Sequence, residues 1–229
     1  MIRYNSFQGV ATIFLDRPEK SHAYTPSMLC ELEEAIRKAE EQTVCVLSST
    51  GGRVFCAGAD KDSLSERRAE DALRLKAQIL FDSISKSRTV FIASMNGPAI
   101  AGGFELALAC DLRVVHPNVY CSLPEVSLGL IPAAGGCTRL SKLVGSSIAR
   151  EVILGGGSIH PQKGLQIGLF HRISEEPDTE ATNWAKQISQ YNPLALQLAK
   201  EVLDSPSLQA ERMAEAVLYE RKRQKEESG

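Results

Sequence analysis

The sequence predicts an α/β protein assembled from repeated strand–loop–helix units. Apolar, β-branched runs at residues 10–16, 44–49 and 90–95 have the length and composition of strands. Each run is followed by a loop that contains glycine or proline, and each loop leads into a stretch with helical spacing of apolar residues. Because strands alternate with helices, we expect an α/β architecture, while the order of the strands stays open.

The first unit joins a strand to an amphipathic helix. Residues 10–16 read VATIFLD, and the segment RPEK at residues 17–20 ends the strand. Pro26 suits the first turn of a helix, where a backbone N–H has no intrahelical partner to lose. Beyond it, apolar residues recur on one side of the predicted helix, at Met28, Leu29, Leu32, Ala35, Ile36 and Ala39.

Two more units follow. The strand VCVLSS at residues 44–49 leads through the loop CAGAD (56–60) to a predicted long, polar helix from about residue 63 to residue 86. The third unit begins at residues 90–95, turns at the sequence NGP, and continues through a glycine pair into the apolar helix FELALAC. The short strand LRVV closes this unit.

The second half of the chain is predicted to be mostly helical. Short helices separated by glycine are followed by two longer ones, at residues 137–145, 146–156, 161–169, 179–191 and 193–203. The final segment is amphipathic as far as Tyr219 and ends in charged residues, with no large apolar residue after Tyr219. We therefore expect its last turns to be frayed or solvated.

The composition indicates one folded domain over residues 1–229. Hydrophobic residues make up 43% of the chain and charged residues 24%, so it can bury a sizeable core. Its 26 basic and 28 acidic residues leave a net charge of −2, which provides no overall attraction for nucleic acid or an anionic membrane. We expect neither partner. The absence of a signal-peptide pattern and of a long apolar run predicts a cytoplasmic protein.

The cysteines and histidines predict neither a disulfide framework nor a metal site. Six cysteines are spread along the chain without a C-x-x-C pair, which favours reduced thiols in a protein of this size. The four histidines show no H-x-x-x-H spacing and no neighbouring cysteines, so the sequence does not support a zinc site.

The segment NGPAIAGGFE, residues 96–105, is the most informative stretch for chemistry. Its two adjacent glycines lead directly into a helix that is apolar except for Glu105. The unpaired amides of a first helical turn carry partial positive charge, so Gly102 can bring its N–H close to a developing oxyanion without interference from a side chain. Gly102 is therefore a candidate oxyanion donor.

Glu105 itself has two interpretations. A carboxylate in a first helical turn is stabilised by the helix dipole or serves as a cap, and taken alone this is the simpler interpretation. Its sequence neighbours are apolar on nearly every side, however, and burying an ionised, unpaired carboxylate is costly. A raised pKa is the expected response, and acid/base chemistry requires such a pKa.

A second carboxylate and two loops are further candidates. Glu125 follows Leu123 and Pro124, although a glutamate in a loop is more often a surface residue or a cap. The loop CAGAD offers more free amides before a helix, and Asp60 is equally readable as an N-cap. The segment IPAAGG, residues 131–136, is either a plain entry into a helix or one wall of a pocket.

Four segments stand in a characteristic order and spacing: RPEK at 17–20, CAGAD at 56–60, NGPAIAGGFELALACD at 96–111 and PEVSLGLIPAAGG at 124–136. Together they resemble the enoyl-CoA hydratase/isomerase (crotonase) superfamily, and the likeness extends from about residue 9 to residue 203. The resemblance implies a crotonase-like spiral of repeated ββα units over residues 1–175. It implies a helical C-terminal part over residues 176–229 that is shorter than usual for the family.

The resemblance also assigns a substrate and a site. It implies acyl-CoA thioester substrates, a homotrimer or dimer of trimers, and no cofactor, because coenzyme A is part of the substrate. By motif match, Glu105 and Glu125 fall on the two catalytic glutamates of family hydratases, and Ala59 and Gly102 on the amides of the oxyanion hole. Substrate contacts are implied at Ala23, Ala57, Asp60, Lys61, Asp62, Pro132 and Ala133.

The activity expected from the resemblance is hydration of a 2-enoyl-CoA, because many family isomerases, decarboxylases and hydrolases lack one or both glutamates. Glu105 is expected to activate the water, Glu125 to transfer the proton, and the two amides to stabilise the enolate oxygen. An isomerase or decarboxylase on the same scaffold is the alternative. An alternative of another class is a non-catalytic acyl-CoA-binding or scaffolding protein.

Three features depart from the family's pattern. Ala133 stands where a glycine is usual, and its methyl group is expected to alter the range of substrates. The segment Ser21-His22-Ala23-Tyr24 stands where the family usually has N-A-L-N. The family's C-terminal E-G-x-x-A-F-L-x-K-R helix has no counterpart, so we expect differences in coenzyme A binding and subunit contacts.

Overall fold

A computed structural model describes residues 1–65 and 68–228 of the chain. Its main feature is a six-stranded sheet with the order β1-β2-β3-β4-β6-β9. The strands are β1 (Ile2–Phe7), β2 (Val10–Leu15), β3 (Val44–Ser49), β4 (Val90–Met95), β6 (Leu112–Val115) and β9 (Arg172–Ile173). Within this sheet β2, β3, β4, β6 and β9 run parallel, which is the arrangement that strand–helix–strand units produce. The predicted α/β class is confirmed.

Strand β1 is the one long strand that the sequence patterns did not predict. It pairs antiparallel with β2 through a tight turn at Gln8 and Gly9, both of which have positive φ. All six of its side chains are partly or fully exposed, so its sequence lacks the apolar run that identifies β2, β3 and β4.

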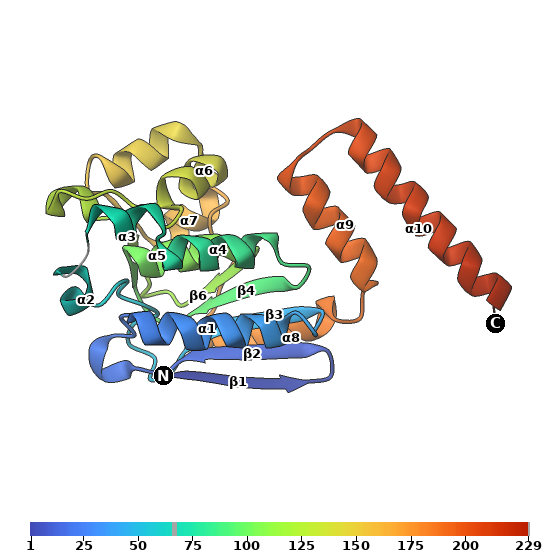
Figure 1. Ribbon diagram of the computed structural model, residues 1–229, viewed down its shortest axis with the longest axis horizontal. Helices are drawn as coiled ribbons and strands as arrows, with labels where there is room; N and C mark the ends of the chain where they lie inside the picture. Colours follow the sequence, from blue (N-terminus) through green and yellow to red (C-terminus); the bar gives the residue numbers. More distant parts are fainter. Residues whose placement is uncertain (66–67, 229) are drawn as a thin grey trace.

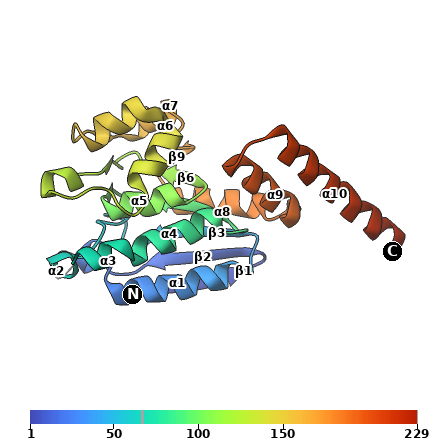
Figure 2. The same ribbon diagram turned by 45° about the horizontal axis from the view of Figure 1, so that its top comes forward.

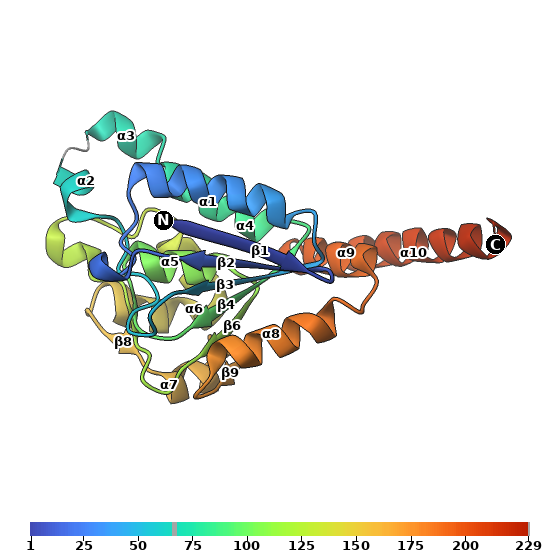
Figure 3. The same cartoon turned by 90° about the horizontal axis from the view of Figure 1, so that it is seen from below.

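Alternate residues of the central strands enter two different cores. Val44 and Val46 of β3 pack in a cluster with residues of α8 (Pro177–Ile188), whereas Cys45 and Leu47 face the larger core. The larger core includes α1 (Pro26–Ala39) and α4 (Lys76–Lys86). Figure 3 shows these two helices on one side of the sheet and α8 on the other. All six apolar positions predicted for the first helix are buried in α1.

The predicted long helix over residues 63–86 is wrong as a single element. The chain instead forms α2 (Lys61–Ser65), α3 (Ala69–Leu73) and α4, and residues 66–67 lie outside the described residues. Only α4 has an apolar face, with Ala77, Leu80, Phe81 and Ile84 buried. Because α3 buries no residue, tertiary packing stabilises a continuous helix only from residue 76 onward.

The third unit carries α5 (Gly102–Ala109) between β4 and β6, with a small second sheet beside its start. That sheet has the order β5-β7-β8 and consists of β5 (Ala99–Ile100), β7 (Cys121–Ser122) and β8 (Ser158–Ile159). β7 precedes the short 3₁₀ helix η2 (Glu125–Leu128), and a loop then leads to α6. The small sheet therefore brings the segments around Gly102 and Glu125 to the same end of the molecule.

The C-terminal half is mostly helical, as predicted. α6 (Gly136–Ile153) contains a break at Gly145, whose φ of 79° is not helical, so it corresponds to the two helices expected on either side of that glycine. α7 (Pro161–Gln166), α8 and α9 (Pro193–Asp204) match the other predictions. α10 (Leu208–Ser228) is a single helix, and its side chains at residues 220–227 are exposed. Figures 1 and 2 show α9 and α10 as a hairpin that extends away from the sheet.

Candidate active site

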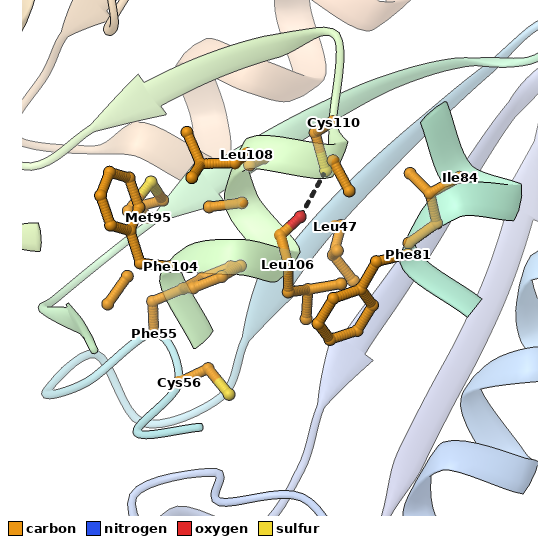
Figure 4. Packing of buried hydrophobic residues seen from close by; sticks show 14 of the residues in the cluster. Leu47, Phe55, Cys56, Phe81, Ile84, Met95, Phe104, Leu106, Leu108 and Cys110 are labelled. Atoms are coloured by element: carbon orange, nitrogen blue, oxygen red, sulfur yellow. Dashed lines mark hydrogen bonds between the residues drawn. The ribbon is translucent and has the colours of Figure 1, made fainter. Parts of the chain in front are cut away.

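The site is organised around α5, whose side chains are all buried. Phe104 and Leu106 project into the main core, where Phe55 and Phe81 pack around them (Figure 4). Ala101, just before the helix, has a φ of 53°, a conformation that costs a non-glycine residue free energy. The helix is thereby fixed by packing along its length, and its first turn faces the loop CAGAD.

Close backbone packing explains the glycine pair at the start of α5. A Cβ on Gly103 would lie 2.0 Å from the carbonyl oxygen of Cys56, and a Cβ on Gly102 would lie 2.0 Å from the hydroxyl oxygen of Tyr24. Gly58, with a φ of +92°, would place its own Cβ 3.0 Å from the Gly102 nitrogen. Three glycines therefore allow the loop and the helix to approach each other directly.

Two backbone N–H groups remain available at this contact. Ala59 and Tyr24 form a parallel β-bridge. Its two hydrogen bonds join the N–H of Tyr24 to Gly58 O and the N–H of Asp60 to Tyr24 O, so the N–H of Ala59 takes no part in the bridge. Gly102 is the first residue of α5 and has no intrahelical acceptor. Within residues 1–65 and 68–228, neither N–H donates to another backbone carbonyl. We refer to the N–H groups of Ala59 and Gly102 as the amide cradle.

Glu105 is buried one turn into α5, with only 3% of its surface exposed. Its Oε1 accepts a 2.8 Å hydrogen bond from the N–H of Gly136, the first residue of α6. Burial raises the pKa of Glu105 to about 7; the Gly136 N–H acts in the opposite direction, and the charge of Glu125 raises it further. The carboxyl group is thus poised to gain or lose a proton near neutral pH.

Glu125 is buried in η2, and its Oε2 has no hydrogen-bond donor among the described residues. Burial raises the pKa of this carboxyl group as well. The charges of Glu105 and Glu125 both raise the pKa of Cys137, after burial as the first cause. Electrostatic influence from both glutamates thus converges on one end of α6, which supports the predicted pairing of the two carboxyl groups.

Arg139 holds the loop that leads to Gly136, whose N–H donates to Glu105. The sequence patterns did not indicate this role. The Arg139 guanidinium donates to Ala134 O at 2.9 Å and to Ser85 Oγ at 3.0 Å. The charge of Arg139 also lowers the pKa of Glu105. Gly135 is needed beside it, because a Cβ there would lie 1.8 Å from the guanidinium and its φ is +109°. In the sequence, Arg139 is one of two basic residues in a predicted helix, and nothing there indicates this role.

The remaining described surface shows no second centre of this kind. Among the described residues, no three His, Cys, Asp or Glu side chains cluster as a metal site requires. Nor does any described helix combine the length and apolar composition needed to cross a bilayer. A cleft of about 1330 Å³ lies between α4, α6 and α9, but neither glutamate is among its described lining residues.

The sequence pattern of the enoyl-CoA hydratase/isomerase family matches residues 5–228. The chain belongs to this family. Among curated relatives, a probable mitochondrial enoyl-CoA hydratase 2 of Arabidopsis thaliana is 36% identical, over 87% of this chain and 68% of its own length. The 2,3-dehydroadipyl-CoA hydratase of Escherichia coli is 35% identical, over 86% of this chain and 78% of its own.

Solved structures of the family share the fold. An enoyl-CoA hydratase subunit from Geobacillus kaustophilus has a TM-score of 0.91 at 33% identity, covering 99% of this chain and 93% of its own. An enoyl-CoA hydratase from Bacillus anthracis has a TM-score of 0.88 at 29% identity, covering 96% and 89%. The predicted crotonase fold is confirmed.

The substrate contacts expected from the family fall on two segments. In the first, residues 21–24 pair with residues 57–60: Ala57 N donates to Ser21 O, and the carbonyl of Ala23 accepts from Arg17. Both carboxylate oxygens of Asp60 are engaged, one by Arg17 at 2.7 Å and the other by Asp62 N at 3.1 Å. Asp60 therefore caps α2, as the sequence allowed. It also forms an ion pair with Arg17, which the sequence did not reveal.

The other expected contacts are more exposed or lie by α6. Lys61 and Asp62 are exposed on α2, beside the amide cradle in sequence. Pro132 is buried, and its Cβ packs against the backbone of Gly136. Ala133 is exposed, and its carbonyl accepts from Gln78 of α4 at 2.9 Å. Whether these residues touch a family substrate stays a prediction.

His22, a departure from the family pattern, has a structural explanation. The side chain is buried, its Nδ1 accepts from Arg17 N at 3.0 Å, and its Nε2 lies 2.9 Å from Thr50 O. Burial lowers the pKa of His22, which favours the neutral ring that this donor–acceptor pattern requires. His22 therefore joins the RPEK turn to the end of β3 rather than acting at the carboxylates.

Proposed function

We propose that this chain is an enoyl-CoA hydratase that adds water across the double bond of a 2-enoyl-CoA thioester. The proposal is supported by two buried glutamates with raised pKa, and by the amides of Ala59 and Gly102, which donate to no backbone carbonyl among the described residues. Hydration needs a base for water, an acid for C2 and a donor set for the enolate oxygen. The relatives named as hydratases support the same activity.

The proposed reaction divides into binding and proton transfer. The thioester oxygen accepts hydrogen bonds from the amide cradle, which stabilises negative charge as the enolate forms. Glu105 removes a proton from water while the water oxygen attacks C3. Glu125 delivers a proton to C2, which completes the 3-hydroxyacyl-CoA, and the proton that Glu105 took from water then returns to Glu125.

The environments of the two glutamates support a proton that the pair shares. The negative charge of Glu125 raises the pKa of Glu105, so the pair retains a proton more readily than two isolated carboxylates. The pair, rather than either residue alone, therefore supplies the proton that hydration moves. No cofactor takes part in the proposed steps, since coenzyme A belongs to the substrate.

The test is loss of conjugated-thioester absorbance when purified protein is mixed with a short-chain 2-enoyl-CoA. We expect Glu105→Gln and Glu125→Gln each to lower kcat by 10²-fold or more, because each removes an acid/base group (on the order of 10²–10⁴). Glu151→Gln, an exposed change on α6, is the matched control and should keep full activity. Wild-type rates in both site variants would contradict the mechanism, and a product with a shifted double bond would identify an isomerase instead.

We also propose that the protein assembles as a homotrimer or a dimer of trimers in the cytoplasm. Exposed apolar side chains on α10 support assembly: Leu208, Met213, Val217 and Tyr219 are between 45% and 70% exposed. Light scattering should give a mass of three or six chains, and Met213→Lys with Val217→Lys should reduce it. A monomer at micromolar concentration would contradict the assembly.

Cell fractionation tests the location, for which the name of the Arabidopsis relative offers a mitochondrial alternative.

A further inference from the structure

Tyr24 lies against both residues of the amide cradle. Its N–H donates to Gly58 O at 2.8 Å, and its carbonyl accepts from Asp60 N at 3.0 Å, so Tyr24 is the bridge partner of Ala59. At the other end of its side chain, the hydroxyl oxygen lies 2.0 Å from the point where a Cβ on Gly102 would stand. One residue therefore spans the cradle from Ala59 to Gly102.

This placement puts a phenol hydroxyl close to the Gly102 N–H. Two covalent bonds of about 1.5 Å separate a Cβ position from the backbone nitrogen, so the hydroxyl oxygen lies within about 5 Å of that nitrogen. A thioester oxygen that accepts from the Gly102 N–H sits at about 2.9 Å from the same atom. The phenol oxygen and the thioester oxygen would therefore both lie within about 5 Å of the Gly102 nitrogen.

The ring of Tyr24 is held in position by its surroundings. Only 6% of the residue is exposed, and the ring meets Phe81 of α4 edge-on, with centroids 5.9 Å apart and planes at 89°. Phenylalanine or leucine could fill this space without placing an oxygen beside Gly102. A hydrogen-bond donor that is already held in place can stabilise the charge of a transition state without any cost for moving into position.

We propose that Tyr24 is a further catalytic residue, whose hydroxyl donates a third hydrogen bond to the thioester oxygen as it becomes an enolate oxygen. The inference rests on the proposed function of the cradle and deepens it. The amides of Ala59 and Gly102 bind the oxygen in substrate and enolate alike, while the phenol strengthens its bond as charge develops. Tyr24 belongs to the segment Ser21-His22-Ala23-Tyr24, which departs from the family's usual N-A-L-N, so we regard the third donor as a feature of this chain.

The test compares Tyr24→Phe with Tyr4→Phe. The first change removes only the hydroxyl at the cradle and keeps the ring against Phe81. The second change removes the hydroxyl of Tyr4, a residue of the edge strand β1, which donates an exposed hydrogen bond to Lys38 O of α1. We expect Tyr24→Phe to lower kcat about tenfold or more with little change in KM, at an unchanged melting temperature, and Tyr4→Phe to keep kcat.

A second measurement does not depend on turnover. Acetoacetyl-CoA ionises to an enolate thioester, and the absorbance of the bound enolate can be titrated against pH. If Tyr24 donates to the enolate oxygen, Tyr24→Phe raises the apparent pKa of the bound ligand by about one unit, which corresponds to the tenfold effect. Wild-type kcat and a wild-type titration in Tyr24→Phe overturn the inference.

The two proposals fail in different ways. If the wild-type protein does not hydrate enoyl-CoA but its bound enolate depends on Tyr24, the hydratase proposal fails and the third donor stands. If hydration proceeds and Tyr24→Phe changes neither readout, only the third donor fails. A wild-type protein that neither hydrates enoyl-CoA nor stabilises the enolate overturns both.

Discussion

Glu105 and Glu125 show how surroundings differentiate two identical side chains. Glu105 has a backbone donor at Gly136, whereas Oε2 of Glu125 is buried with no donor among the described residues. Burial is the first cause of the raised pKa in both cases. Burying these carboxyl groups as anions costs free energy. The folded state is therefore less stable with two ionised glutamates at these positions, although the proposed chemistry requires both residues.

The raised pKa of Glu105 predicts a pH-dependent stability. The unfolded chain loses this proton near the ordinary value of 4.5, whereas the folded protein keeps it up to about 7. The free energy of unfolding therefore falls as pH rises between these values and stays lowered above them. Glu105→Gln should be more stable than wild type above neutral pH, by up to about 3 kcal/mol, with the difference closing below the ordinary pKa. Urea unfolding across pH measures it; a constant difference would contradict the assignment.

Gly102 predicts a steric effect that a second substitution relieves. In Gly102→Ala the new methyl group overlaps the Tyr24 hydroxyl, and overpacking of this kind costs about 1–3 kcal/mol. Adding Tyr24→Leu should recover most of that stability, because the shorter side chain leaves the space. Thermal unfolding of both single variants and the double variant tests the coupling. Additive effects would show that the two residues do not interfere.

At the scale of elements, the site depends on where helices begin. The start of α5 provides the Gly102 amide and Glu105, and the start of α6 provides the Gly136 amide that binds Glu105. The loop between η2 and α6 must therefore hold a fixed position relative to α5. Arg139 provides this by binding Ala134 O on the loop and Ser85 Oγ on α4.

Loss of the Arg139 contacts should be visible in activity and in its pH profile. In Arg139→Gln the loop loses its bond at Ala134 O, and Glu105 loses a positive charge that lowers its pKa. We expect kcat to fall about tenfold, since small displacements of catalytic groups are costly. We also expect the rise of kcat with pH to occur at a higher pH. Arg150→Gln, an exposed change on the same helix, is the control. A lower kcat with an unmoved pH profile would limit Arg139 to a structural role.

At the scale of the whole molecule, the hairpin of α9 and α10 is attached by few contacts. No residue of α9 is fully buried, although Leu196 packs against the core beneath α8. Lys200 reaches inward and binds Asp111 Oδ2 at 2.8 Å and Thr89 O at 3.1 Å. Among the described residues, two ion pairs join α9 to the rest of the fold, and the Lys200–Asp111 pair is the more buried of the two.

Removal of the Lys200–Asp111 pair should loosen the hairpin. Lys200→Ala leaves Asp111 without its cation, and we expect a loss of roughly 1–3 kcal/mol with faster proteolysis around residues 189–192. Lys142→Ala is the matched control, because Lys142 pairs with Asp204 where both side chains are more than half exposed, and such pairs contribute about 0–1 kcal/mol. Equal effects of the two changes would contradict this role of the Lys200–Asp111 pair.

Much of the fold could be predicted because its signals are local. The spacing of apolar residues in α1 and the β-branched runs of β2, β3 and β4 depend on neighbours within one element. β1 and the break before α4 were missed, because an exposed edge strand has no apolar run and because only packing determines where a polar helix stops. The two candidate glutamates and the glycine pair were recognisable as motifs, although their roles remain predictions.

The sequence by itself determined the repeated units, the near-neutral charge and the four motifs that indicated the family. Only the tertiary structure decided which groups meet. Gly136 binds Glu105 across 31 residues, Arg17 pairs with Asp60 across 43, and Tyr24 reaches Gly102 from another unit of the fold. Such contacts leave no periodic signal, because they depend on chain packing and not on spacing along one element. The raised pKa values also depend on burial, which exists only once the chain has folded around them.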